Sequence, residues 1–149
     1  MVRPTVHTAA DVPLRRHSDV ASETMALTAE EEGVALAFGA HLGGKRAVRL
    51  MQSSGLGNCV NFLSMVKGGH FPFLTILSMR GDFGEGNPWQ MAMGRATRPV
   101  LAAMDFVVLE ITKPEEVAPT IAAASDMVWK GGQAVAVLLT QKLIGAKAF

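Results

Sequence analysis

Short apolar runs alternate with helix-like segments along most of this chain. Continuous apolar runs of strand length are typical of strands in a parallel sheet that is covered on both faces. Four such runs occur, at 47–51, 71–78, 106–110 and 134–139. We expect a strand at each of them and a helix between successive strands. The alternation therefore predicts an α/β fold, a three-layer arrangement of a parallel sheet with helices on both faces.

Glycines end the first two expected helices. Helix 31–42 begins within three consecutive acids, which the helix dipole favours at an amino end, and it stops at Gly43-Gly44. No wholly polar face survives along this helix, so we expect it to be buried on most sides. Helix 58–67 carries apolar residues at i, i+3, i+4 and i+7 spacing and is closed by the glycine pair that follows.

Prolines and glycines make the second half of the chain less regular. The stretch 80–98 is rich in both, so we expect a long loop that is functional or mobile. This loop leaves room for a short helix at about 98–104. A capping-box spacing at 112–115 starts a further helix that continues to about Lys130. Pro119 either kinks this helix or marks its true beginning.

The first 25 residues do not share the alternating pattern. Pro4 and Pro13 interrupt any helix, and the segment lacks the apolar core of a secretory signal. We therefore expect a poorly ordered tail at 1–25, followed by one domain at 26–149.

Composition narrows the classes of function. A length of 149 residues suits one domain with a real core, and the net charge of +1 gives no electrostatic case for binding nucleic acid. The longest apolar runs are strand-sized, so no membrane span is expected. The single cysteine, Cys59, excludes an internal disulfide, fits a reducing, cytoplasmic compartment and is expected to be a core residue. A hydrophobic share of 49% indicates additional burial in a subunit interface.

Two segments could carry chemistry at one edge of the predicted sheet. The polar, glycine-containing turn 52–58 leaves the carboxyl end of strand 47–51, which is where open α/β sheets bind their ligands. Glu30 lies one helix earlier, and we expect it to face the same crevice. Read from the residues alone, Glu30 could equally be a solvated acid in a first helical turn, and the turn an ordinary tight connection. The turn is neither a dinucleotide fingerprint nor a Walker loop.

The order of these residues resembles a known family. Glu30 followed by Gly39, then Gly43-Gly44-Lys45 and the run 51–58, is similar to the pyrimidine-binding domain of thiamine-diphosphate-dependent enzymes. The similarity continues through 78–81 to the closing run 134–139, so it covers roughly residues 27–149. Within this family the sequence most resembles the alpha subunit of sulfopyruvate decarboxylase and the N-terminal half of phosphonopyruvate decarboxylase.

The resemblance implies a role for each motif. In this family the glutamate, here Glu30, hydrogen-bonds a ring nitrogen of the cofactor's aminopyrimidine and helps the thiazolium carbon to lose its proton. The cofactor then serves as the electron sink when a 2-oxoacid loses carbon dioxide. The turn lines the pocket beside the pyrimidine ring, and its expected contact residues are Gln52, Ser53, Ser54, Gly55, Leu56, Gly57 and Asn58.

The resemblance also implies a second chain. The family's magnesium motif, Gly-Asp-Gly followed further on by asparagine, is not found in this sequence. Asp82, Glu85 and Asn87 lie together but do not match it. We therefore expect no metal ligands here, and a partner, beta subunit that holds magnesium and the diphosphate within a hetero-oligomer. The expected substrate is a small 2-oxoacid bearing a sulfonate, phosphonate or carboxylate, which Arg80 could bind, unless it is simply a surface arginine.

The beginning of the domain departs from the family pattern. A pyrimidine-binding domain normally starts with a strand, a loop and a helix ahead of the glutamate, and too little patterned sequence precedes Thr28 to form them. The first βα unit is therefore expected to be missing or replaced. Two other hypotheses stay open: a truncated, non-catalytic remnant of the domain, and an unrelated α/β domain that binds a nucleotide or acyl group at the same turn.

Overall fold

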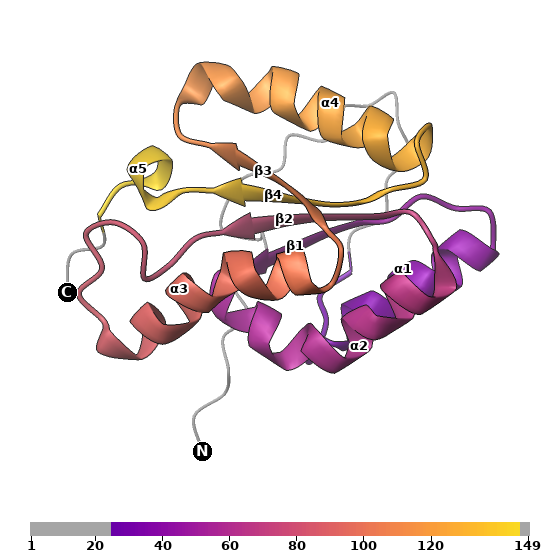
Figure 1. Ribbon diagram of the computed structural model, residues 1–149, viewed down its shortest axis with the longest axis horizontal. Helices are drawn as coiled ribbons and strands as arrows, with labels where there is room; N and C mark the ends of the chain where they lie inside the picture. The colour runs from indigo at the N-terminus through magenta and orange to yellow at the C-terminus, as the bar shows by residue number, and fades with distance from the viewer. Residues whose placement is uncertain (1–24, 147–149) are drawn as a thin grey trace.

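A four-stranded parallel sheet forms the centre of the protein (Figure 1). The computed structural model describes residues 25–146. The strands lie in the order β1-β2-β4-β3, and every neighbouring pair is parallel. Their bounds are Val48–Gln52 for β1, Phe73–Ser78 for β2, Val107–Ile111 for β3 and Ala134–Leu139 for β4. All four predicted strands are confirmed, with ends that differ by at most two residues.

Helices cover both faces of this sheet, which confirms the predicted three-layer α/β fold. Figure 1 shows α1, α2 and α3 below the sheet and α4 above it. The long helices are α1 (Glu32–Leu42), α2 (Leu56–Gly69), α3 (Pro88–Ala103) and α4 (Val117–Trp129). A short helix, α5 (Gln141–Ile144), follows β4, and 3-10 turns η2 (Ser53–Gly55) and η3 (Pro114–Glu116) precede α2 and α4.

Two apolar layers result from the alternation of side chains along the central strands. On β4, Ala136 and Leu138 point into the layer between the sheet and helices α1, α2 and α3, whereas Val135 and Val137 point into the layer between the sheet and α4. All four residues are fully buried. A strand covered on both faces has no position left for a polar residue, which explains the unbroken apolar run in the sequence.

Strand β1 does not follow the prediction of a continuously buried strand. Its burial alternates: Arg49 and Met51 are buried, whereas Val48 and Leu50 are 51% and 46% exposed. The reason is position, because β1 is an edge strand of the described sheet and α4 packs against β2, β3 and β4 instead. No strand precedes α1 within residues 25–146. The predicted tail at 1–25, and any replacement of the first βα unit within it, lie outside the described residues except for Met25.

Helix α1 is less enclosed than its composition predicts. Gly33, Val34 and Ala37 are buried, but Leu36 and Leu42 are exposed. The helix packs against β1 and α2, so only one side of it is covered. Its apolar outer side cannot be distinguished from a buried side by residue type alone.

The predicted loop at 80–98 is wrong over half of its length, because α3 already begins at Pro88. Asn87 caps this helix, with its Oδ1 accepting a hydrogen bond from the N–H of Trp89 at 3.1 Å, and proline suits the first helical position. Gly94 lies inside the helix. A Cβ at Gly94 would collide with the backbone of Arg80 and Gly81, so this glycine permits close packing.

The start of α4 also differs slightly from the prediction. Glu116, one residue after the expected position, accepts hydrogen bonds from the N–H groups of Thr112 and Lys113 at 2.8 and 3.1 Å. Pro119 lies in the first turn of α4, where an N–H has no intrahelical partner to lose. The helix therefore begins just before Pro119.

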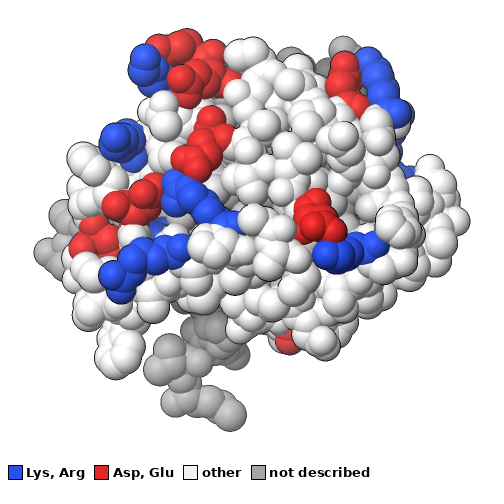
Figure 2. All heavy atoms as spheres, in the orientation of Figure 1, with Lys and Arg blue, Asp and Glu red and all other residues white. Residues whose placement is uncertain are grey.

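The described surface is mixed in charge. Figure 2 shows lysine and arginine side chains lying among aspartates and glutamates on the face in view, separated by wide uncharged areas. Across residues 25–146, none of the helices is both long enough and apolar enough to cross a membrane.

Candidate functional site

Glu30 and the turn after β1 meet at the carboxyl edge of the sheet. Strand β1 ends at Gln52, the chain turns through η2, and α2 starts at Leu56. Glu30 lies two residues before the start of α1, and its Oε2 accepts a hydrogen bond of 2.8 Å from Nδ2 of Asn58. The structure thus brings together two segments that are far apart in sequence and that were both selected as candidates for chemistry.

Gly55 allows Glu30 to lie directly on the turn. A Cβ at Gly55 would lie 2.6 Å from Cγ and 2.9 Å from Oε1 of Glu30, which is too close for any side chain. The backbone of Gly55 has an ordinary φ of −67°. Glycine is therefore required here for space and not for conformation.

The three consecutive acids have three different surroundings. Only Glu30 bonds the turn. Glu32 accepts hydrogen bonds from the N–H groups of Thr28 and Ala29 at 3.0 and 3.4 Å and so stabilises the entrance to its own helix. Oε2 of Glu31 is buried and has no hydrogen-bond partner. The geometry therefore distinguishes Glu30 from its two neighbours, as the sequence spacing predicts.

The seven predicted contact residues of the turn are not equally accessible. Gly57 and Asn58 are exposed, and Gln52 and Ser54 are half-buried, with Nε2 of Gln52 donating to Oγ of Ser54 at 2.6 Å. In contrast, Ser53, Gly55 and Leu56 are buried. The side chains of Ser53 and Leu56 therefore face the protein interior, and only Gln52, Ser54 and Asn58 can present side-chain atoms to a ligand.

Cys59 is a core residue, as predicted, and it has an unexpected partner. Its thiol is fully buried and donates to the carbonyl of Gly55 at 3.2 Å, while Nη1 of Arg49 donates to its sulfur at 3.0 Å. Burial raises the pKa of the Cys59 thiol above its ordinary value. Sequence reasoning missed buried Arg49, although an arginine within a short apolar strand is a signal that could have been noticed.

Arg80, the predicted substrate ligand, forms an ion pair inside the protein. Its Nε and Nη2 donate to Oε2 and Oε1 of Glu85 at 2.7 and 2.8 Å, and the two side chains are 11% and 3% exposed. The hydrogen bond from Arg80 is the main reason that the pKa of Glu85 falls from 4.5 to about 2. Arg80 could bind a substrate anion only by giving up this bidentate contact.

Other charged groups near this loop are also paired. Nε of Arg98 lies 2.5 Å from Oε1 of Glu110, and its Nη2 lies 3.7 Å from Oδ2 of Asp82. The hydrogen bond from Arg98 lowers the pKa of Glu110. Within the described part of the chain, no cluster of three or more His, Cys, Asp or Glu side chains could hold a metal ion.

Sequence reasoning also missed Gln141. This residue starts α5, is almost completely buried, and contacts the loop that carries Arg80. The sequence contained one usable signal, a long polar side chain directly after the carboxyl end of the last apolar strand.

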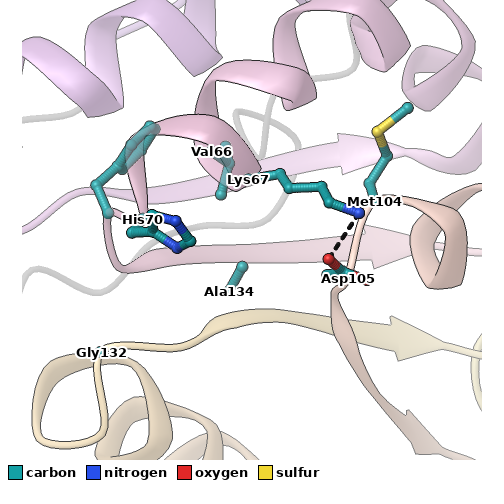
Figure 3. A pocket seen from close by; sticks show the side chains of 8 residues that line it. Val66, Lys67, His70, Met104, Asp105, Gly132 and Ala134 are labelled. Atoms are coloured by element: carbon teal, nitrogen blue, oxygen red, sulfur yellow. Dashed lines mark ion pairs between the residues drawn. The ribbon is translucent and has the colours of Figure 1, made fainter.

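A hollow of about 180 Å³ lies at the opposite edge of the sheet (Figure 3). Its lining residues lie near the amino ends of β2, β3 and β4, as His70, Asp105 and Gly132 do. Figure 3 shows Lys67 reaching across to Asp105, where the two side chains form an ion pair of 2.7 Å. His70 caps the end of α2 in the left-handed conformation. The hollow therefore contains none of the residues that surround Glu30.

Comparison with known proteins supplies relatives over most of the chain. The alpha subunit of sulfopyruvate decarboxylase from Methanothermobacter thermautotrophicus is 41% identical over 123 residues, which cover 82% of this chain and 74% of the relative. The same subunit from Methanococcus maripaludis is 39% identical over 114 residues, covering 76% and 68%. Phosphonopyruvate decarboxylase from Streptomyces viridochromogenes is 39% identical over 91 residues, covering 60% of this chain but 23% of that longer protein. No family model matches the sequence.

The α/β fold, the acid at the carboxyl edge of the sheet and the shared description of these relatives define the class of protein as a decarboxylase subunit or domain. The identity and coverage then specify the family. The chain belongs to the family of sulfopyruvate decarboxylase alpha subunits. This confirms the resemblance that the sequence motifs indicated.

Proposed function

We propose that this chain is the pyrimidine-binding subunit of a thiamine-diphosphate-dependent 2-oxoacid decarboxylase, a carboxy-lyase that acts in the cytoplasm. The observation that supports this most is the contact between Glu30 and Asn58, because it holds a carboxylate at the ligand-binding edge of the sheet. Relatives described as decarboxylase subunits support the reaction class. In this proposal Glu30 is the catalytic acid.

The groups around Glu30 suit an aminopyrimidine. Such a ring offers nitrogen atoms and an exocyclic amine, and the turn offers a carboxylate, the amides of Gln52 and Asn58 and the hydroxyl of Ser54. A carboxylate oxygen has two lone pairs, so the bond from Asn58 leaves Glu30 able to accept another proton. When bound, thiamine diphosphate supplies an electron sink for decarboxylation. Glu30 would hold and release one proton at the ring nitrogen, and Asn58 would fix the carboxylate for that transfer.

The buried part of the turn would act through shape. Gly55 leaves space for Glu30, while Ser53 and Leu56 fix the backbone from within. The exposed backbone at Gly57 would allow a flat ring to approach. These roles assign all seven turn residues to cofactor binding, although only four of them offer exposed or half-exposed atoms.

Substrate and metal complete the proposal. The substrate would be a small 2-oxoacid, with sulfopyruvate or phosphonopyruvate as the leading examples because the relatives are named for them. A partner, beta subunit would bind magnesium and the diphosphate, since an anionic diphosphate depends on a metal for charge compensation. The resulting enzyme would be a hetero-oligomer in which this chain contributes the acid.

Calorimetric titration and a carbon dioxide assay test the proposal together. The purified chain should bind thiamine diphosphate weakly, and addition of the partner should give magnesium-dependent binding and release of carbon dioxide from sulfopyruvate or phosphonopyruvate. A Glu30→Gln chain, which keeps the size of the side chain, is the matched control for the acid. Tight, magnesium-dependent binding by this chain alone would contradict the two-chain proposal, and inactivity of every chain mixture would contradict the reaction.

A further inference from the structure

The loop between β2 and α3, residues 79–87, is fixed by side chains from two other parts of the fold. The N–H of Arg80 donates to Oγ of Ser53 at 2.9 Å, in the turn after β1. The N–H groups of Asp82 and Phe83 donate to Oε1 of Gln141 at 2.7 and 2.8 Å, after β4. Backbone groups that a surface loop normally leaves to water are here bonded to buried protein atoms.

Glu85 is the centre of this arrangement. Besides the two bonds from Arg80, its carboxylate accepts the N–H of Asn87 at 2.9 Å, the N–H of Gly81 at 3.2 Å and Nε2 of Gln141 at 3.1 Å. With 3% of its side chain exposed, Glu85 depends on these donors for stability as an ion. The positive charge of Arg80 balances it within the protein.

Gln141 has the side chain that this position requires. Its carbonyl oxygen accepts two backbone N–H groups, and its amide nitrogen donates to the carboxylate of Glu85. A glutamate could satisfy the two N–H groups, but it would place a second carboxylate against Glu85. A leucine of similar size would leave the two N–H groups without a partner and would remove one of the donors to Glu85.

The fixed loop connects to the place where Glu30 lies. Ser53, which accepts the N–H of Arg80, begins the 3-10 turn that ends at Gly55. Gly55 in turn contacts Glu30 so closely that a Cβ would be excluded. Gln141, Glu85, Arg80, Ser53 and Gly55 therefore form a continuous series of contacts from the end of β4 to the candidate catalytic acid.

We propose that Glu85 and Gln141 are positioning residues that hold the turn beneath Glu30, and that Arg80 is the counter-ion of Glu85 and not a ligand of the substrate. The effect on catalysis rests on the proposed function, whereas the effect on the loop does not. The anionic group of the substrate is then bound by other residues.

Hydrogen exchange on the purified chain tests the positioning itself. In Gln141→Leu, the amides of Asp82 and Phe83 should exchange roughly tenfold faster or more, which corresponds to the loss of about one hydrogen bond each. Ser53→Ala should do the same for the amide of Arg80. Asp105→Asn is the matched control, because it breaks the ion pair with Lys67 at the opposite edge of the sheet without touching the loop. Unchanged exchange at Asp82 and Phe83 in folded Gln141→Leu would overturn the positioning role.

Kinetics of the assembled enzyme tests the role of Arg80. Arg80→Gln and Glu85→Gln each leave one buried charge unpaired, whereas the double variant removes both charges. If Arg80 is only a counter-ion, the double variant should recover stability relative to both single variants and should keep KM for the 2-oxoacid within about twofold of wild type. A KM that stays raised about tenfold or more in the double variant would show that Arg80 binds the substrate.

Gln141→Leu supplies the complementary kinetic result. A positioning residue should lower kcat with little change in KM, because the substrate still binds while the acid is misplaced. Full kcat in a variant whose loop exchanges faster would overturn the link between the loop and Glu30. The exchange experiment needs neither cofactor nor partner, so failure of the proposed function would not be confused with failure of the loop assignment.

Discussion

Nδ2 of Asn58 donates a hydrogen bond of 2.8 Å to Oε2 of Glu30 and so joins the first turn of α2 to the residues that precede α1. The two residues are 28 positions apart in the chain. Their contact fixes a carboxylate at the edge of the sheet where α/β proteins bind ligands. It also distinguishes Glu30 from Glu31 and Glu32, neither of which bonds the turn.

Glu30→Gln should retain the fold but remove most of the decarboxylase activity of the assembled enzyme. A general acid–base group commonly contributes about a hundredfold to ten-thousandfold to the rate. Glu31→Gln and Glu32→Gln should cost far less, because neither side chain bonds the turn. Rates of carbon dioxide release for the three variants check this. Equal losses of activity in all three variants would contradict the assignment of Glu30 as the catalytic acid.

Gly55→Ala should impair function more than stability. The new Cβ would overlap Cγ of Glu30 at 2.6 Å, and the glutamate is the group that can move away. Gly68→Ala is the control, since nothing lies within 4 Å of its Cβ and it lies in α2 outside the turn. We expect kcat to fall by about tenfold or more for Gly55→Ala and to change little for Gly68→Ala. Thermal unfolding of both variants shows whether the fold is retained.

The stability of the chain should decrease in acid partly through Glu85. Its pKa is about 2 in the folded protein against an ordinary 4.5, so its ionised form stabilises the fold above about pH 4.5. That stabilisation is lost progressively as the pH falls from about 4.5 towards 2. Urea unfolding should show that the free energy of unfolding decreases less between pH 7 and pH 3 for Glu85→Gln than for wild type.

A matched variant makes the Glu85 result specific. Glu110 also pairs with an arginine, but its side chain is 38% exposed, and such pairs contribute at most about 1 kcal/mol. Between pH 7 and pH 3, Glu110→Gln should therefore lose nearly the same free energy of unfolding as the wild-type chain. If Glu85→Gln and wild type lose the same free energy of unfolding between pH 7 and pH 3, the ion pair with Arg80 is not a stabilising contact.

Cys59 should be unreactive in the folded chain. Its sulfur is fully buried, and burial raises the pKa of the thiol, so the reactive thiolate is scarce near neutral pH. Reaction with an aromatic disulfide reagent at pH 8 should be about a hundredfold slower than in denaturant, with a rate set by local opening. A fast reaction in the native state would contradict the packing around α2.

The order of strands and helices could be predicted because strands buried on both faces form continuous apolar runs in the sequence. β4 is apolar at every position because both faces are covered. β1 looks similar in sequence, yet Val48 and Leu50 are exposed because no helix of the described residues covers that side. An apolar residue type shows that a side chain can be buried. Whether it is buried depends on which helices and strands lie against it.

The candidate site was predictable in part for a similar reason. Glu30 and the turn are local motifs with a fixed order, so resemblance could identify them. The pairing of Arg80 with Glu85, the contacts of Gln141 and the burial of Arg49 depend on how distant strands are placed. The beginning of α3 at Pro88 was not predicted, because glycines and prolines favour a loop and a close packing such as that of Gly94 against Gly81 depends on tertiary structure.

Trp89 gives the chain a built-in optical probe. It is one of two tryptophans, it lies at the amino end of α3, and it is 88% exposed. Trp129 is partly covered and lies beneath the guanidinium of Arg46, 5.7 Å from the centre of its ring. Emission from the free chain should therefore contain a long-wavelength, readily quenched component from Trp89. Any macromolecule that covers the start of α3 should shift that component to shorter wavelength, so subunit association can be followed without a label.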